Sequence, residues 1–187
     1  AARELLEKAV AQNPQLAVAQ AWLGMILLEL SDQQPFNAWY RDLPAGVKPT
    51  AGLWVVRGLW SQQQPKAAAR CFWEALRQNP NHQVACYQLA IALTRVGQEE
   101  LAEQIKDRAR RLQELELLLS RLNDDKNNLT LLTEAARLTE QLGRFWESYG
   151  WHSMILVGQS NAVESRAALT RLRPIVQAES RQVAAKF

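Results

Sequence analysis

The sequence repeats one pattern of small, large and proline residues, and this repetition constrains the fold more than any other feature. Two segments share spacings of 4, 3 and 5 residues: Ala2, Leu6, Ala9 and Pro14 in the first, and Ala68, Phe72, Ala75 and Pro80 in the second. Both segments end in Gln-Asn-Pro. Their offset of 66 residues is about twice a period near 33, and a fixed period of this size is typical of stacked repeats. The pattern therefore predicts one further repeat between the two segments.

A second marker recurs with a similar period. Gly24 and Gly58 lie 34 residues apart, and Ala90 follows 32 residues later. A small residue at these positions lets the facing helix of a hairpin approach closely, while Leu6 and Phe72 fill the space between neighbouring hairpins. A proline cannot continue a helix and constrains the residue before it to extended geometry, so the chain must turn at the end of each pair.

These positions resemble the tetratricopeptide repeat family, whose 34-residue helix-turn-helix unit carries Leu-Gly or Leu-Ala, then Ala-x3-Phe and a closing Pro. The unit from Leu53 to Pro80 matches well, and the next unit has Lys106 where an aromatic residue is usual. A weaker resemblance is to repeat segments of large bacterial multidomain proteins. The family resemblance implies an all-α fold, a tetratricopeptide-like right-handed superhelix of stacked antiparallel helix pairs.

We expect a single helical-repeat domain over residues 1–187. Its expected segments are the second helix of a truncated repeat (1–14), a degenerate repeat (17–49), a repeat (50–80), a repeat with an extended second helix (83–123), a looser repeat (129–158) and C-terminal capping helices (161–187). Pro174 is predicted to end the first capping helix. The second helix of the degenerate repeat is expected to be short or irregular, because it runs into Pro44, Gly46 and Pro49.

Composition places the chain among ordinary globular proteins. Apolar residues make up 48% and charged residues 22%, and the net charge of +3 is too small to indicate nucleic-acid binding. No apolar stretch is long enough for a membrane span. The chain opens inside a helical pattern without an initiator Met, so we interpret it as a fragment. Its compartment is unknown: cytoplasmic by default, exported if the missing upstream segment carries a signal peptide.

Residues for catalysis are scarce. The chain has two histidines, His82 and His152, and two cysteines, Cys71 and Cys86, without the spacing of zinc ligands. We interpret His82 as a solvated turn residue, His152 as a packed or surface imidazole, and the cysteines as small buried hydrophobes. The chain is therefore not expected to be an enzyme, and no catalytic residue, cofactor, metal site or small-molecule substrate is expected.

The resemblance implies that the first helix of each repeat lines a concave groove. The family's inward positions, carried over to this sequence, give Trp22, Met25, Leu59, Tyr87 and Ile91 as partner-binding residues. Val55 and Val56 also fall on inward positions. This surface is apolar and lacks the Lys, Arg and Asn with which some family members grip a C-terminal carboxylate, so such a clamp is disfavoured. Core packing of Trp22 and Leu59 is the simpler alternative.

The function expected from this surface is a protein-protein interaction scaffold that binds a peptide, a second copy or a neighbouring domain through an apolar concave groove. Seven tryptophans strengthen the expectation, because interfaces favour these large rings as anchors. Two alternatives remain open: a non-catalytic regulatory segment of a larger enzyme, and an RNA-binding helical repeat. Acidic residues interleave with the basic stretch Lys106–Arg111, which favours a solvated helix face over a nucleic-acid patch.

Overall fold

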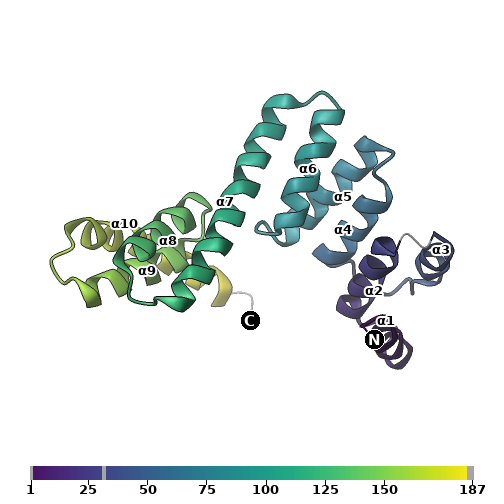
Figure 1. The fold of residues 1–187 in the computed structure, drawn as a ribbon, viewed down its shortest axis with the longest axis horizontal. Coiled ribbons are helices and arrows are strands. Elements are labelled where there is room, and N and C mark those ends of the chain that lie inside the picture. The colour runs from purple at the N-terminus through teal and green to yellow at the C-terminus, as the bar shows by residue number, and fades with distance from the viewer. Residues whose placement is uncertain (1, 31–32, 185–187) are drawn as a thin grey trace. The chain divides into compact units, whose positions relative to one another are not determined.

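The protein is all-α. The computed structural model describes residues 2–30 and 33–184, and within these ranges it contains ten helices and no strand (Figure 1). The helices are α1 (Ala2–Gln12), α2 (Ala17–Glu29), α3 (Gln33–Asp42), α4 (Ala51–Trp60), α5 (Pro65–Gln78), α6 (Gln83–Arg95), α7 (Glu99–Asp124), α8 (Leu129–Gln141), α9 (Phe145–Gly158) and α10 (Val163–Ala184). The all-α fold class and the long second helix after residue 98 are confirmed.

The helices form two compact units, residues 1–109 and 110–187, with the boundary inside α7. In unit 1, α2 packs against α1, α3 and α4, and α5 packs against α4 and α6. In unit 2, α9 packs against α8 and α10. Successive helices are therefore neighbours in space, as the short connections require. The single continuous domain over residues 1–187 stays a prediction.

Local signals in the sequence set where helices begin and end. The side chain of Thr50 accepts a hydrogen bond from the backbone of Leu53, and that of Asn128 accepts one from Leu131, so each satisfies a donor at the start of a helix. Asn128 thus caps α8. Gly97 and Gly143 have φ of 78° and 75°, left-handed values that suit a residue just after a helix. They make tight turns between α6 and α7 and between α8 and α9.

The small residues of the repeat allow close helix contacts, as predicted. A methyl group added at Gly24 would lie 2.8 Å from Cζ2 of Trp39, and one added at Gly58 would lie 2.7 Å from Cζ of Phe72. Both distances are shorter than carbon atoms tolerate. The third small residue, Ala90, is buried. The hairpins α2–α3 and α4–α5 thus each pair a glycine on the first helix with a large ring on the second.

Replacing Gly58 by Ala is expected to destabilise unit 1 even though Ala favours helix. The propensity gain is about 1 kcal/mol, whereas overpacking against the fully buried Phe72 ring costs about 1–3 kcal/mol. Chemical denaturation should show a net loss of stability for Gly58→Ala. Adding Phe72→Leu to that variant should recover part of the loss, and a stabilised single variant would contradict the close contact.

The degenerate repeat closes with a cluster of aromatic rings instead of the Ala-x3-Phe pattern. Its second helix, α3, is short, as expected. Phe36 is fully buried and stacks on Trp60 of α4, with ring centroids 4.3 Å apart. Trp39 donates from Nε1 to Oε1 of the buried Gln20, at 2.7 Å, and so satisfies two polar groups inside the hairpin.

The predicted end of the first capping helix at Pro174 is wrong. Pro174 does not end a helix: α10 continues through it to Ala184, and residues 185–187 lie outside the described part. An internal proline costs roughly 3 kcal/mol because it removes a backbone hydrogen bond. Here Leu172 and Val176 are buried on either side of it, and the exposed position of Pro174 leaves the freed carbonyl open to water. Burial of both flanking residues therefore outweighs the helix-breaking tendency.

Candidate functional site

Three of the predicted partner-binding residues occupy equivalent positions on the first helices of unit 1. Met25, Leu59 and Ile91 each directly follow the small residue that faces the hairpin partner, namely Gly24, Gly58 and Ala90. All three are partly buried. Met25 also packs against the core cluster that contains Leu23 and Leu27. These residues therefore lie at the margin of the core, with part of each side chain accessible.

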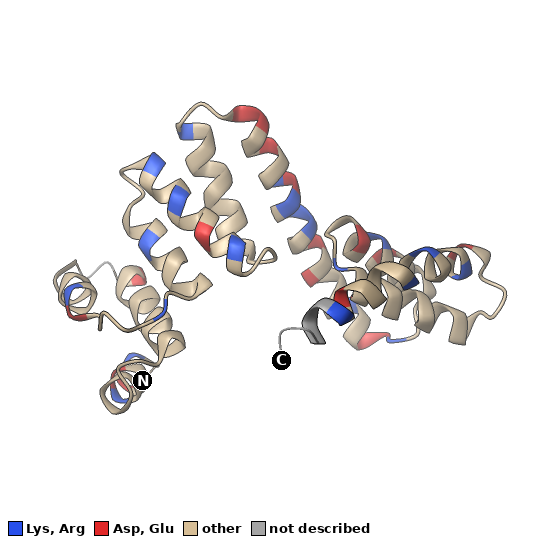
Figure 2. Ribbon diagram, turned by 180° about the vertical axis from the view of Figure 1, so that it is seen from behind, with Lys and Arg blue, Asp and Glu red and all other residues tan. Residues whose placement is uncertain are grey.

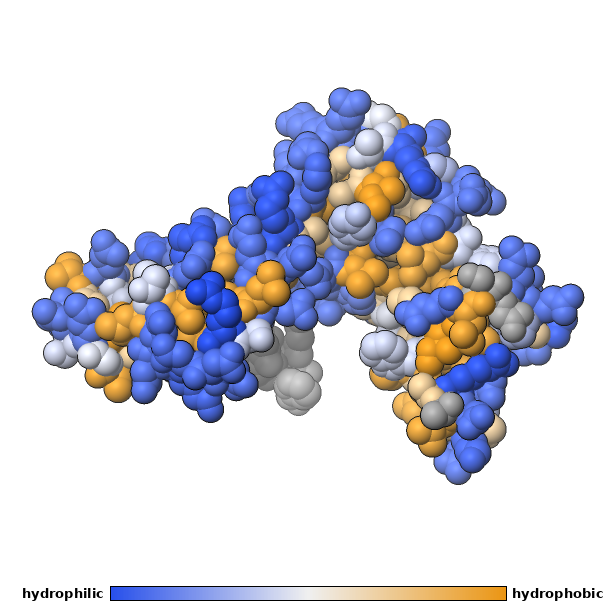
Figure 3. Space-filling view, in the orientation of Figure 1, coloured by the Kyte–Doolittle hydropathy of each residue, from blue (hydrophilic) through white to orange (hydrophobic). Residues whose placement is uncertain are grey.

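The other two predicted residues extend into solvent. Trp22 on α2 is 60% exposed and Tyr87 on α6 is 56% exposed. Val18 and Val84, about one helical turn before them, are exposed as well. Figure 3 shows apolar surface over the part of unit 1 formed by α1, α2 and α4. We call the set Val18, Trp22, Met25, Leu59, Val84, Tyr87 and Ile91 the apolar row.

Val55 and Val56 do not belong to this row, which corrects their assignment to inward positions. Both are fully buried, and Val56 packs with Leu23, Leu27 and Phe36. The helix α4 lies against α2, α5 and α6, so most of its circumference is covered. Partly accessible residues remain along α4, among them Trp54, Arg57 and Leu59, and Trp60 is exposed.

A pocket of about 190 Å³, lined by both apolar and polar side chains, lies beside the apolar row. Gln62 donates from Nε2 to Oε1 of Gln88, at 3.1 Å, and Arg95 donates to the backbone carbonyl of Gln62, at 3.2 Å. These bonds tie the loop after α4 to α6. Ile91 of the row and the Phe72 ring also line the pocket. An apolar segment lying on the row would therefore meet amide groups at this end.

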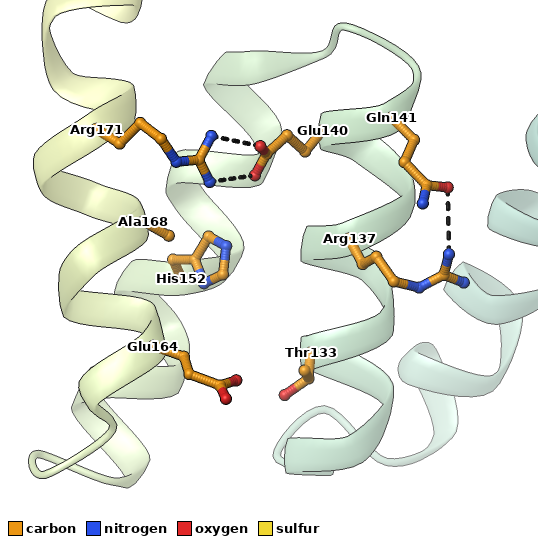
Figure 4. Close-up of a pocket in the computed structure, with 8 residues that line it drawn as sticks. All are labelled: Thr133, Arg137, Glu140, Gln141, His152, Glu164, Ala168 and Arg171. Atoms are coloured by element: carbon orange, nitrogen blue, oxygen red, sulfur yellow. Dashed lines mark hydrogen bonds and ion pairs between the residues drawn. The ribbon is translucent and has the colours of Figure 1, made fainter.

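Unit 2 carries a different, polar cavity of about 510 Å³ (Figure 4). Its lining comes from three helices: Thr133, Arg137, Glu140 and Gln141 of α8, His152 of α9, and Glu164, Ala168 and Arg171 of α10. Arg171 donates to both carboxylate oxygens of Glu140, with Nη2 3.0 Å from Oε2, and so links α10 to α8. Figure 4 shows the Glu164 carboxylate directed toward Thr133 across the cavity.

A histidine of this cavity lies where the repeat pattern of unit 1 has a large apolar residue. Ser148, His152 and Ile155 have the spacings of 4 and 3 that Ala68, Phe72 and Ala75 have in unit 1. His152 therefore takes the place of a ring that would otherwise fill the space between hairpins. This spacing is a signal in the sequence that our interpretation of His152 missed.

The polar groups in the cavity act on one another. His152 Nδ1 lies 3.1 Å from the hydroxyl of Ser165, which is buried. Burial lowers the pKa of His152, while the charge of Glu140 raises it and that of Arg171 lowers it. The hydrogen bond from Arg171 lowers the pKa of Glu140. These contacts fasten α8, α9 and α10 together.

The structure also shows the surroundings of His82 and of the basic stretch Lys106–Arg111. His82 is not a solvated turn residue: it is half-buried and caps α6, accepting at Nδ1 from the backbone of Ala85.

Charges of both signs alternate along α7 (Figure 2). Lys106 pairs with Glu103, while Arg108 donates to the carbonyl of Pro80 and so holds the turn before α6. The basic stretch thus contributes to the fold of unit 1.

The described residues contain no group of three or more His, Cys, Asp or Glu placed to hold a metal ion. None of the helices in residues 2–30 and 33–184 has the length and apolar content that crossing a membrane requires. The sequence matches no protein-family model and no curated protein.

Proposed function

We propose that this chain is a tetratricopeptide-like interaction scaffold whose apolar row binds an apolar peptide segment of a partner protein. The supporting observation is the exposure of Trp22 and Tyr87 on helices that are otherwise packed. A surface helix usually has a polar stripe toward water. In α2 the one charged residue is Glu29, at its last position, and the exposed side is filled by Val18 and Trp22.

Binding explains this exposure better than stability does. Exposed aromatic rings contribute little to the folded state, whereas buried aromatic anchors dominate the energetics of interfaces. The row is narrow and runs across neighbouring helices, which suits an extended or helical peptide. The amide groups of Gln62 and Gln88 at one end would hydrogen-bond polar groups of the same segment. A row of this kind fits a scaffold whose specificity depends on its partner's apolar side chains.

The experiment is selection of peptides from a random phage-displayed library on the purified chain, followed by titration of the enriched peptides. Trp22→Ala and Tyr87→Ala should each weaken binding at least tenfold, since truncating an anchor costs about 2 kcal/mol or more. Both variants should keep the parent's melting temperature, because the removed side chains are exposed.

The matched control is Trp73→Ala. Trp73 is a partly exposed ring on α5, outside the apolar row, so its loss should leave peptide affinity unchanged. Equal binding by all three variants would place the peptide elsewhere and refute the proposal. If Trp22→Ala and Tyr87→Ala have lower melting temperatures than the parent, these residues belong to the core and the site assignment fails.

A further inference from the structure

The helix α9 is rich in apolar residues, and several of them lie at the surface. Its sequence has one carboxylate, Glu147, which is paired with Arg144 through both oxygens. Only Ser148 and Ile155 are fully buried. Trp146 is 53% exposed and Val157 is 90% exposed. The large apolar side chains of a surface helix normally face the core, so α9 lacks part of its cover within unit 2.

Four of the exposed residues of α9 form one stripe that includes a glycine. Trp146, Gly150 and Met154 follow at intervals of four residues, and Val157 lies three residues further on. At 3.6 residues per turn these four positions fall within an arc of roughly 80°. A methyl group added at Gly150 would have no atom within 4 Å, so the middle of the stripe is open. Another helix can therefore approach the backbone of α9 closely at Gly150.

The two ends of this stripe differ in shape. At the N-terminal end, the indole of Trp146 projects into solvent. At the C-terminal end there is a cavity of about 490 Å³, lined by Asn127, Leu129, Leu132, Met154, Val157 and Gly158. We call this cavity the α9 socket. It is large enough for an indole ring, and its walls are mostly apolar.

We propose that a second copy of this chain covers α9, with the two α9 helices antiparallel and crossing at Gly150. A two-fold axis at Gly150 brings the N-terminal end of each α9 to the C-terminal end of the other. Trp146 of each copy then enters the α9 socket of its partner, so that one contact is made twice, as a two-fold interface requires. The sulfur of Met154 provides a favourable contact for the indole.

Charge also favours a second copy as the occupant. The carboxylate of Glu147 is neutralised by Arg144, so pairing two identical helices brings no unpaired like charges together on this face. Along the stripe, the projecting Trp146 ring comes first, then Gly150, then the α9 socket. A two-fold rotation about Gly150 therefore places the ring of each copy opposite the socket of the other. The inference is independent of the proposed function, because it uses unit 2 and leaves the apolar row free.

Sedimentation equilibrium of the purified chain is the first test. The parent should be a dimer, and Gly150→Arg should be a monomer with its dissociation constant raised at least 100-fold. Arg favours helix more than Gly does, so circular dichroism should show undiminished helix in this variant. Trp146→Ala should raise the dissociation constant at least tenfold. Thr170→Arg, which adds the same charge at an exposed site on α10, should leave the dimer intact.

Cysteine cross-linking then tests the antiparallel geometry in a Cys71→Ser background. Gly150→Cys lies on the axis and should form a disulfide-linked dimer on oxidation. Val157→Cys lies on the same stripe but seven residues from the axis, so its two thiols would be roughly 20 Å apart and should not cross-link. A monomeric parent, a dimeric Gly150→Arg variant, or equal cross-linking at both positions would overturn the proposal.

Discussion

Replacing Phe72 by Ala is expected to lower the free energy of unfolding by about 3–5 kcal/mol, the usual cost of truncating a buried Phe. The Phe72 ring is fully buried and fills the space that Gly58 leaves between α4 and α5. It also lines the pocket of about 190 Å³ beside α6. Truncation would enlarge that void, and neighbouring side chains cannot close it without moving two helices. Urea denaturation of the two proteins measures the loss.

The adjacent residue provides the control for this substitution. Trp73 belongs to the same helix and is larger, but it is partly exposed. Trp73→Ala should therefore cost less than Phe72→Ala despite removing more atoms. If the two variants lose similar stability, Phe72 is not the ring that joins the hairpins, and the repeat register over Leu53–Pro80 is wrong.

The second large effect is expected at Phe36, whose replacement by Ala should also cost about 3–5 kcal/mol. Its fully buried ring stacks on Trp60 with centroids 4.3 Å apart and is tilted against Trp39 at 5.2 Å. Aromatic pairs add about 0.5–1.5 kcal/mol beyond the area they bury. Denaturation followed by tryptophan fluorescence is a suitable measurement, because both neighbours of Phe36 are indoles.

Tyr40 is the matched control for Phe36. It lies one turn further along α3 and its ring is parallel to that of Phe36, but it is exposed and its centroid is 6.0 Å away. Tyr40→Ala should change stability by less than a third as much as Phe36→Ala. Comparable losses would mean that α3 is held by its outer surface, contrary to the burial of Phe36.

The sequence was sufficient to predict the positions of the helices because spacing and turn residues act locally. The short α3 followed from Pro44 and Pro49, and the long α7 from the absence of Pro and Gly over residues 98–123. Pro174 shows the limit of local reasoning. Its effect on the helix depended on whether Leu172 and Val176 found a core to enter, and that is a property of the tertiary structure.

The residues of the candidate sites also differ in whether the sequence alone could predict them. Exposure of Trp22 and Tyr87 agrees with the positions implied by the resemblance, since each follows helical spacing on one helix. Burial of Val55 could not be predicted, because it requires knowing how many helices surround α4. The α9 socket was missed for a related reason. It combines the start of α8 with the end of α9, and its hollow shape leaves no pattern in the sequence.

The helix α7 has a consequence for how this protein loses its structure. The boundary between the two compact units falls inside its 26 residues, so one helix contributes residues to both units. Helix formation is costly to begin and inexpensive to extend. In arrays of repeats, stability spreads from each unit to its nearest neighbour through such couplings. In this protein the two units are coupled through the backbone of α7. Melting of either unit is therefore expected to destabilise the other.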